Sequence, residues 1–332
     1  MFQKATSLLS TRLLLLFALF VLTACAPVAP GAAQPATDTS ATAKPVELRI
    51  GYQRGGAWTI LKAQGTLEKR FGPNVTVTWT LFPAGPPLLE AMNAGSLDIG
   101  PTGETPPIFA QAAGTPLVYV AAQSGSGAGS GILVPADSPL QAPTDLKSKK
   151  IAFTKASSAH LLLIKALAQQ KLQYSEIEPV FLAPPEARAA FQSGSIDAWV
   201  VWNPFREAAV QELNARELIN GGTVAPTKGY ILAANTFTTE HPDLLVAIIE
   251  ELQKVQLWAN DNVEAYAAIL EKETEIPASV WIASHDQEAT EYALMDEATV
   301  TYQQEVADIF YGLQLIPEPL QIKDVVWFGP ED

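Results

Sequence analysis

Residues 91–98, Ala-Met-Asn-Ala-Gly-Ser-Leu-Asp, recur in similar form as residues 190–197, Ala-Phe-Gln-Ser-Gly-Ser-Ile-Asp. Four of these eight positions are identical, and the other four are conservative exchanges. Upstream at the same offset, residues 82–86 align with residues 181–185, and a slightly shifted offset aligns residues 49–52 with residues 150–153. One strand–helix–strand–helix–strand unit therefore occurs twice.

The hydrophobic pattern around the repeat predicts alternating strands and helices. We expect strands at 46–53, 75–82, 97–100 and 117–122, with helices at 57–70, 86–94 and 106–113 between them. The second copy spans about 149–220, a return strand covers 230–234, and helices follow from 239 onward at about 244–259, 262–271, 278–284 and 294–312. Such alternation predicts parallel sheets and the α/β class.

Two similar α/β lobes joined by a hinge, with extra C-terminal helices, are the architecture that this pattern predicts. At 332 residues the chain exceeds the size at which one core usually stops growing. We expect lobe 1 to comprise residues 45–132 and 235–332, and lobe 2 residues 133–234. Two such lobes imply a cleft between them, which is where a small molecule would be held.

The N-terminus has the pattern of an exported lipoprotein. Lys4 and Arg12 precede an apolar run from Leu13 to Leu22, which is too short to span a bilayer. The run ends in Leu-Thr-Ala-Cys, and Cys25 is the only cysteine of the chain. We expect residues 1–25 to be a signal peptide with Cys25 lipidated, although a buried thiol is an alternative. Residues 26–44, which consist mostly of Ala, Pro, Thr, Gly and Ser, are expected to form a disordered tether.

Composition excludes several classes of site. The formal net charge is −14, or −16 without Lys4 and Arg12, which argues against nucleic acid and against adhesion to anionic lipid. The three histidines, at 160, 241 and 285, are far apart in the sequence and form no i, i+4 pair, so we expect no metal site. The glycine-rich run 124–131 lacks both phosphate-loop spacings and is interpreted as a flexible segment near the crossover between lobes. We expect no cofactor.

Small polar residues follow the expected strands, where ligands sit in open parallel sheets. Such residues begin helices, whose first N–H groups are free and lie at the positive end of the helix dipole. Two lobes facing each other would direct several helix starts at one point, which predicts an anion site. The candidate ligand-binding residues are Gln53, Arg54, Gly55, Trp58, Gly85, Gly103, Glu104, Thr105, Ser157, Ser158, His160, Trp202 and Asn203.

Each candidate also has a purely structural interpretation. Ser157, Ser158 and Thr105 suit helix caps, which does not prevent a cap from lining a cleft. Trp202 suits either the core or an apolar wall for an organic tail, with Trp58 as the opposing wall. Arg54 suits either an anionic head group or the solvated surface.

These junctions resemble the substrate-binding proteins of ABC importers for aliphatic sulfonates, within the wider sulfonate, nitrate and taurine binding group. The resemblance covers about residues 46–245. It is carried by Leu48–Gln53, Phe82–Pro86, Gly103–Pro107, Ser157–His160 and Trp202–Phe205. It implies a periplasmic-binding-protein fold of the second type, with two crossovers. Glu104 and Asn203 depart from it, since the family commonly has Asp at both places.

The resemblance implies a solute-binding protein that captures a small organic anion, above all an alkyl- or arylsulfonate, and delivers it to an ABC permease. Taurine, nitrate, bicarbonate or a pyrimidine precursor are alternative cargoes. An enzyme on the same scaffold is a further alternative, but the cysteine- and histidine-rich iron motif of the pyrimidine-forming relatives is absent. We therefore expect a non-enzymatic monomer, exported and attached to the membrane through its lipid alone.

Overall fold

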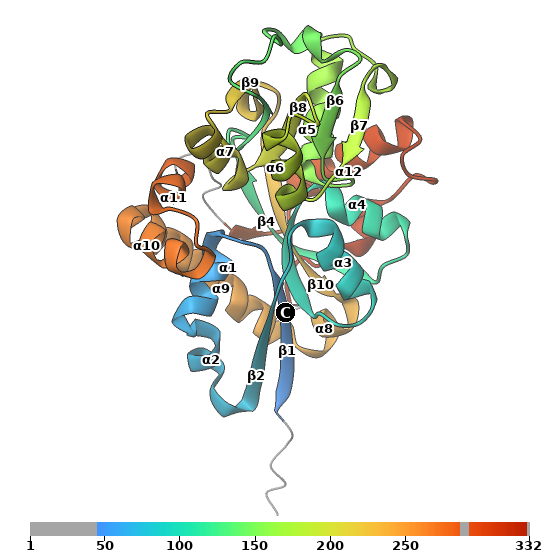
Figure 1. The fold of residues 1–332 in the computed structure, drawn as a ribbon. Helices are drawn as coiled ribbons and strands as arrows, with labels where there is room; N and C mark the ends of the chain where they lie inside the picture. The colour runs from blue at the N-terminus through green and yellow to red at the C-terminus, as the bar shows by residue number, and fades with distance from the viewer. Residues whose placement is uncertain (1–44, 286–291, 331–332) are drawn as a thin grey trace, which may run out of the picture. The chain divides into compact units, whose positions relative to one another are not determined.

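Two β-sheets organise the chain in the computed structural model, which describes residues 45–285 and 292–330 (Figure 1). These residues belong to one compact unit. The expected signal peptide, Cys25 and the tether all lie outside the described residues.

The first sheet holds the first copy of the repeated unit, together with return strands from later in the chain. In order across the sheet, its strands are β11 (Tyr292–Leu294), β4 (Leu117–Gly125), β10 (Thr227–Ala234), β3 (Ile99–Gly103), β1 (Val46–Tyr52) and β2 (Val75–Leu81). Strands β1, β2 and β3 are parallel, whereas β10 runs antiparallel to both β3 and β4.

The second sheet contains the second copy. Its strands, in order, are β7 (Glu178–Phe181), β6 (Lys150–Phe153), β8 (Ala198–Trp202), β5 (Ser130–Val134) and β9 (Arg216–Asn220). Strand β6 is parallel to both β7 and β8, so the order β7–β6–β8 repeats the order β2–β1–β3 of the first sheet. The internal duplication predicted from the sequence is therefore present in the fold.

The repeated sequence motif performs the same structural task in both copies. Gly95 and Gly194 end their helices with φ of 71° and 69°, a left-handed conformation that glycine adopts without cost. The next N–H, of Ser96 or Ser195, donates back to the carbonyl of Ala91 or Ala190 at 2.9 and 3.0 Å, which completes a Schellman cap.

The aspartate that ends the motif then fixes the following strand. The Asp98 carboxylate accepts the backbone N–H of Arg49 at 2.7 Å, and Asp197 accepts that of Lys150 at 2.8 Å. In each copy the aspartate N–H also donates to the carbonyl of that same residue, at 2.8 and 2.9 Å. These paired bonds hold β3 beside β1 and β8 beside β6.

Helices cover both faces of both sheets. The described helices are α1 (Gly56–Gln64), α2 (Thr66–Phe71), α3 (Gly85–Asn93), α4 (Thr105–Ala112), α5 (Ser158–Gln169), α6 (Pro184–Gln192), α7 (Phe205–Leu213), α8 (Asn235–Glu240), α9 (Pro242–Asp261), α10 (Val263–Thr274), α11 (Ala278–His285) and α12 (Glu297–Gly312). Apolar residues of α1, α2 and α8–α11 pack on one face of the first sheet, and those of α3, α4 and α12 on the other. In the second sheet, α5 covers one face and α6 and α7 the other.

The sequence predicts that lobe 2 begins at residue 133 and ends at residue 234, and the structure differs at both ends. Strand β5 pairs with β8 and β9 and so belongs to the second sheet from Ser130 onward. Strand β10, expected in lobe 2, pairs with β3 and β4 and completes the first sheet. The prediction that β10 belongs to lobe 2 is therefore wrong. The hydrophobic pattern of a strand shows that the strand is buried, but it does not show which sheet the strand joins. The chain crosses between lobes twice, at residues 126–129 and 221–226.

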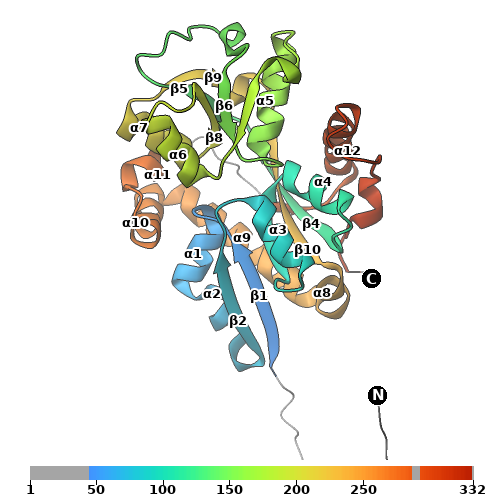
Figure 2. The same cartoon turned by 45° about the vertical axis from the view of Figure 1, so that its right-hand side comes forward.

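The C-terminal helices return to the first lobe, as predicted, and two of them also meet the second. Figures 1 and 2 both show α11 beside α7, and α12 on the opposite side near α4 and α5. Helix α9 begins with Pro242 at its first position, where proline's missing N–H has no partner to lose. Among the described residues, none of the helices combines the length and apolar character needed to cross a bilayer.

Candidate functional site

A cavity of about 300 Å³ lies where the carboxyl ends of the two sets of parallel strands face each other. Its walls include the segments that follow β1, β2 and β3 in the first lobe and those that follow β6 and β8 in the second. Strands β4, β5 and β10, which adjoin the crossovers, close it on a further side. The two sets of helix starts therefore converge on one space.

Most of the predicted site residues line this cavity. Those that do are Gln53, Arg54, Gly55, Trp58, Gly85, Gly103, Glu104, Ser157, Ser158, Trp202 and Asn203. They come from both lobes and lie up to 150 positions apart in the chain (53 to 203), so the fold alone brings them together.

Thr105 and His160 do not line the cavity. Thr105 is fully buried at the first position of α4, and the His160 side chain is 1% exposed. The His160 ring lies among Phe109, Phe153, Tyr174 and Phe310, at centroid distances of 6.3, 4.9, 5.5 and 5.5 Å. Burial, followed by the charge of Lys155, lowers the pKa of His160 to about 4. The first turn of α5 therefore places this ring among aromatic side chains of both lobes and outside the cavity lining.

The helix starts offer fewer N–H donors than their sequence positions predict. Prolines occupy the first turn of α3, α4 and α6, and proline has no N–H to donate. Helices α1 and α5, by contrast, begin with Gly56-Ala57 and Ser158-Ala159 and keep their first donors. The starts of α1 and α5, one in each lobe, therefore keep more N–H donors for an anion than those of α3, α4 and α6.

The serines at the start of α5 have separate tasks. Ser157 occupies the N-cap position, but its hydroxyl donates to the Thr154 carbonyl at 2.7 Å instead of capping the helix. Ser158 hydrogen-bonds to Glu104, across the boundary between the lobes. A Cβ on Gly103 would lie 2.0 Å from the Ser158 Oγ, so the absence of a side chain there lets the lobes approach at this point.

Glu104 is the one carboxyl group among the described residues that line the cavity. It is 2% exposed, and burial raises its pKa. Its own backbone N–H, the charge of Lys165 and the Ser158 hydroxyl act in the opposite direction but are smaller effects. The environment therefore favours the protonated acid more than water does, and a protonated acid can donate a hydrogen bond.

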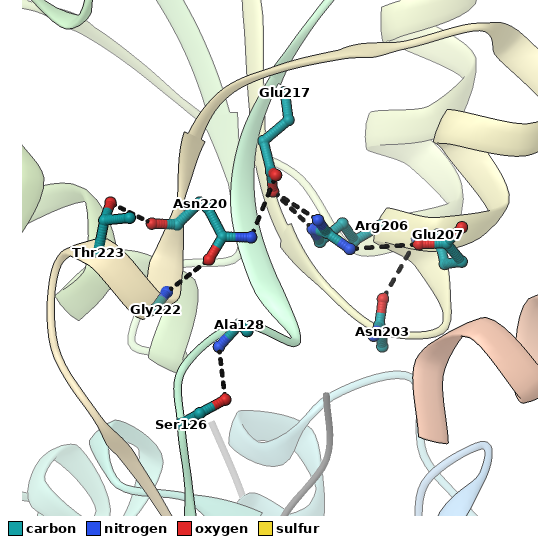
Figure 3. A network of polar contacts seen from close by, with 9 residues as sticks. All are labelled: Ser126, Ala128, Asn203, Arg206, Glu207, Glu217, Asn220, Gly222 and Thr223. Carbon is teal, nitrogen blue, oxygen red and sulfur yellow. Dashed lines mark hydrogen bonds and ion pairs between the residues drawn. The ribbon is translucent and has the colours of Figure 1, made fainter. Parts of the chain in front are cut away.

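Asn203 is held by a polar network in the second lobe (Figure 3). Its Oδ1 accepts the backbone N–H of Glu207 at 3.2 Å, which ties the side chain to the first turn of α7. The Glu207 carboxylate in turn pairs with buried Arg206 at 3.3 Å, and Arg206 pairs with Glu217 at 2.7 Å. The network fixes the orientation of Asn203 relative to strand β9.

Aromatic side chains give the cavity apolar walls in both lobes. Trp58 is 3% exposed and belongs to the core beneath the first sheet, yet one side of it borders the cavity. Trp202 is half-buried on the opposite lobe. Each tryptophan can therefore pack in its own lobe and also form a wall of the cavity. Gly55, with φ of 93°, lies so close to Trp281 that a Cβ would be 2.5 Å from its ring.

Several lining residues lie outside the set predicted from the sequence. They are Gly56, Pro101, Thr102, Pro106, Gln123, Ser130, Thr227, Lys228, Gly229, Tyr230, Trp281 and Tyr292. Many of them lie on β4, β10, β11 and α11, which carry no motif and reach the cavity through tertiary packing. Among them, the Lys228 ammonium is 2.9 Å from the Ser124 hydroxyl and 5.7 Å from the centroid of the Tyr302 ring.

The Arg54 guanidinium is partly engaged. One of its N–H groups donates to the Thr274 carbonyl at 2.9 Å, and the residue is exposed. Across residues 45–285 and 292–330, no group of three or more His, Cys, Asp and Glu side chains is placed to hold a metal ion.

Comparison with known proteins agrees with this geometry. A family model described as the NMT1-like family matches residues 41–271. A protein of Escherichia coli (strain K12), described as binding aliphatic sulfonates, is 38% identical over 291 residues, which is 87% of this chain and 91% of the relative. The alkanesulfonate-binding protein SsuA from Xanthomonas axonopodis pv. citri, bound to MOPS, has a TM-score of 0.81 and 35% identity over 86% of this chain and 99% of its own.

The same fold extends to more distant proteins of other activity. The desulfurization enzyme DSZB has a TM-score of 0.61 and 14% identity, covering 85% of this chain and 96% of its own, and shows the fold alone. The resemblance to sulfonate-binding proteins that the sequence indicated is confirmed, and the chain belongs to the NMT1-like family.

Proposed function

We propose that this chain is the solute-binding protein of an ABC importer and that it captures a small organic anion, foremost an aliphatic sulfonate, between its two lobes. The observation that carries the proposal is the cavity itself, where residues of both lobes and two donor-bearing helix starts meet. The similarity to sulfonate-binding proteins supports the choice of cargo.

The site has the chemistry that a sulfonate needs. A sulfonate presents several oxygens of one charged group, which accept hydrogen bonds from backbone N–H, hydroxyl and guanidinium donors. The helix starts of α1 and α5, Ser158 and Arg54 supply such donors, while Trp58 and Trp202 provide apolar area for an organic group. The overall negative charge does not prevent this, because nearby donors act at much shorter range than distant surface charges.

Calorimetric titration with a panel of anions tests the cargo. The panel contains methane-, ethane- and butanesulfonate, MOPS, taurine, nitrate and bicarbonate. We expect submillimolar binding of at least one simple sulfonate, with weaker binding of nitrate, which has no organic group to cover the tryptophans. The absence of submillimolar binding of every sulfonate would contradict the sulfonate assignment.

Taurine is the second candidate cargo, and Asn203 is the residue that distinguishes the two. A carboxylate at this position would attract the taurine ammonium, whereas the amide does so weakly. We expect Asn203→Asp to raise the affinity for taurine relative to ethanesulfonate. Asn214→Asp, on the exposed end of α7, is the matched control and should leave this ratio unchanged.

Catalysis on the same scaffold is the alternative from another class, since DSZB shares the fold. A binding protein releases its cargo unchanged. Prolonged incubation with a bound sulfonate, followed by mass spectrometry, should recover the same compound, whereas sulfite or another product would overturn the assignment.

Export and lipid anchoring form a separate part of the proposal. The apolar run before Cys25 and the polar stretch after it suggest a signal peptide, a lipidated cysteine and a tether that leaves the lobes free to bind solute and meet a permease. Mass spectrometry of the mature N-terminus should find a diacylated or triacylated Cys25. A chain that keeps residues 1–24, or an unmodified Cys25 in membranes that process lipoproteins, would contradict this part.

A further inference from the structure

A second cavity, of about 190 Å³, adjoins the central one on the side of Arg54 and Trp202. We call it the side chamber. It shares Gln53, Arg54 and Trp202 with the central cavity. The rest of its lining is apolar and comprises Leu81, Phe82, Pro83, Pro185 and Phe205.

The side chamber is built where the duplicated loops face each other. Leu81 ends β2 in the first lobe, and Phe82 and Pro83 follow it. Pro185 lies at the start of α6, the equivalent place in the second lobe. Trp202 and Phe205 meet edge to face, with ring centroids 6.4 Å apart and planes at 86°. Both lobes therefore contribute walls, so the chamber exists in this form only when the lobes are close together.

From this juxtaposition we infer that the side chamber binds the distal apolar part of the organic anion, and that the chain is selective for sulfonates with a long alkyl or aryl tail. The inference rests on the proposed function and goes further, because it names the part of the substrate that is discriminated. The charged group stays in the central cavity, among the donors of the two helix starts.

Size and polarity both fit an apolar tail. An apolar cavity of about 150 Å³ in another protein holds benzene, so about 190 Å³ accommodates a phenyl ring or several methylene groups. No carboxyl group lies among the described residues that line the chamber, and its polar residues are confined to the side that it shares with the central cavity. A polar or charged tail would lose its hydration there without finding partners.

The chamber also opens outward. Leu81 is 44% exposed, and Pro83 and Pro185 are exposed as well. A tail longer than the chamber can therefore continue toward solvent instead of being rejected. Affinity should rise with tail length until the chamber is filled and then level off.

Calorimetric titration with ethane-, butane-, hexane- and octanesulfonate and with benzenesulfonate tests the inference. Burial of each further methylene group should lower the dissociation constant by about fourfold until the series levels off. Equal affinity for ethane-, hexane- and octanesulfonate would overturn the inference while leaving the proposed function intact. Failure of every sulfonate to bind would instead contradict the proposed function.

Two exposed residues at equivalent strand ends supply a matched pair of variants. Leu81 is the last paired residue of β2 and lines the chamber, whereas Phe181 is the last paired residue of β7 and lines neither cavity. We expect Leu81→Ser to weaken octanesulfonate binding several-fold and to leave ethanesulfonate binding unchanged. Phe181→Ser should change neither. The same loss in both variants would overturn the inference.

A filling variant tests the same space without removing a contact. Pro185 is exposed in the first turn of α6, where a larger side chain has room outside the core. Pro185→Trp should weaken octanesulfonate and benzenesulfonate binding while preserving that of ethanesulfonate. If the long and short ligands keep their ratio of affinities, the tail does not occupy the chamber.

Discussion

At the scale of single residues, Glu104 is the least expected member of an anion-binding cavity, because it is an acidic side chain. A carboxylate in the cavity repels an anion, but burial raises the pKa of this group and makes the protonated acid more accessible. Lys165 on α5 opposes this shift, and Lys228 and Tyr230 on β10 and Tyr302 on α12 also lie near Glu104. The charge of Glu305 on α12 acts on Lys165 and Tyr302. The charge state of Glu104 should therefore be coupled to binding.

We predict that sulfonate affinity falls as the pH rises. An anion bound beside Glu104 raises the pKa of this carboxyl group further, so Glu104 takes up a proton when the anion binds. Uptake of one proton makes the affinity fall by at most about tenfold for each unit by which the pH rises. In Glu104→Gln this dependence should disappear, because the amide does not titrate. Titrations between about pH 5 and 9 measure both slopes, and equal slopes in the two proteins would contradict the coupling.

His160 is predicted from the sequence to contact ligand, and the structure gives it a different task. The sequence shows its place in the first turn of a helix, but the direction of the side chain depends on α4 and α12 packing against α5. Neither ring nitrogen has a hydrogen-bond partner among the described residues. An aromatic environment of this kind favours the neutral ring.

His160 should make the fold sensitive to acid. Its pKa is lowered from 6.5 to about 4 in the folded state. Between these values the unfolded chain binds a proton that the folded chain does not, so the free energy of unfolding falls as pH falls, by about 1.4 kcal/mol per pH unit at most. His160→Phe should show a shallower slope in urea unfolding between pH 6.5 and about 4. If His160→Phe keeps the slope of the original protein, protonation of the His160 ring does not destabilise the fold, and the prediction is wrong.

At the scale of elements, the repeat allows the sequence to predict most of the fold. Both copies are recognisable because their helix ends and following aspartates need the same residue types: a left-handed glycine, a serine and a carboxylate. The sequence assigns β10 and residues 130–132 to the wrong lobes, because pairing between strands that are distant in the chain leaves no local pattern. The same reason explains why Gln123, Tyr230 and Trp281 are missing from the predicted site.

The cap glycines provide a test of this element-level account. Gly194 has φ of 69°, and no atom lies within 4 Å of the place that a Cβ would take, so Gly194→Ala adds only backbone strain. We predict a loss of about 1 kcal/mol in the free energy of unfolding. Gly312 also has open space but no positive φ and ends α12, so Gly312→Ala should be neutral or slightly stabilising. Equal effects of the two substitutions would contradict the role of the glycine cap.

At the scale of the whole molecule, the two lobes touch on both sides of the cavity. On one side α5 packs against α4, and its Leu161 and Ile164 join the apolar core of the first lobe. On the other side α7 meets α11, where the Ser279 hydroxyl donates to Gln211 Oε1 at 2.9 Å. This second contact includes hydrogen bonds between polar groups of Gln211 and Ser279, which suits a surface that separates when the cavity opens.

Removal of the hydrogen bonds between Gln211 and Ser279 should affect ligand release more than capture. Gln211→Ala loses the bond to Ser279, so we predict a dissociation rate about two- to tenfold higher with little change in the association rate. Gln192→Ala, an exposed glutamine on α6, is the control. Stopped-flow measurements of tryptophan fluorescence follow both rates, and unchanged release from Gln211→Ala would show that this contact does not hold the lobes together.

The central claim is that both lobes hold one anion between the start of α1 and the start of α5. A crystal structure of the protein with ethanesulfonate tests it most directly. We predict sulfonate oxygens within hydrogen-bonding distance of donors from both lobes, with the ethyl group toward Trp202. A sulfonate bound by one lobe alone, or bound outside this cavity, would contradict the account.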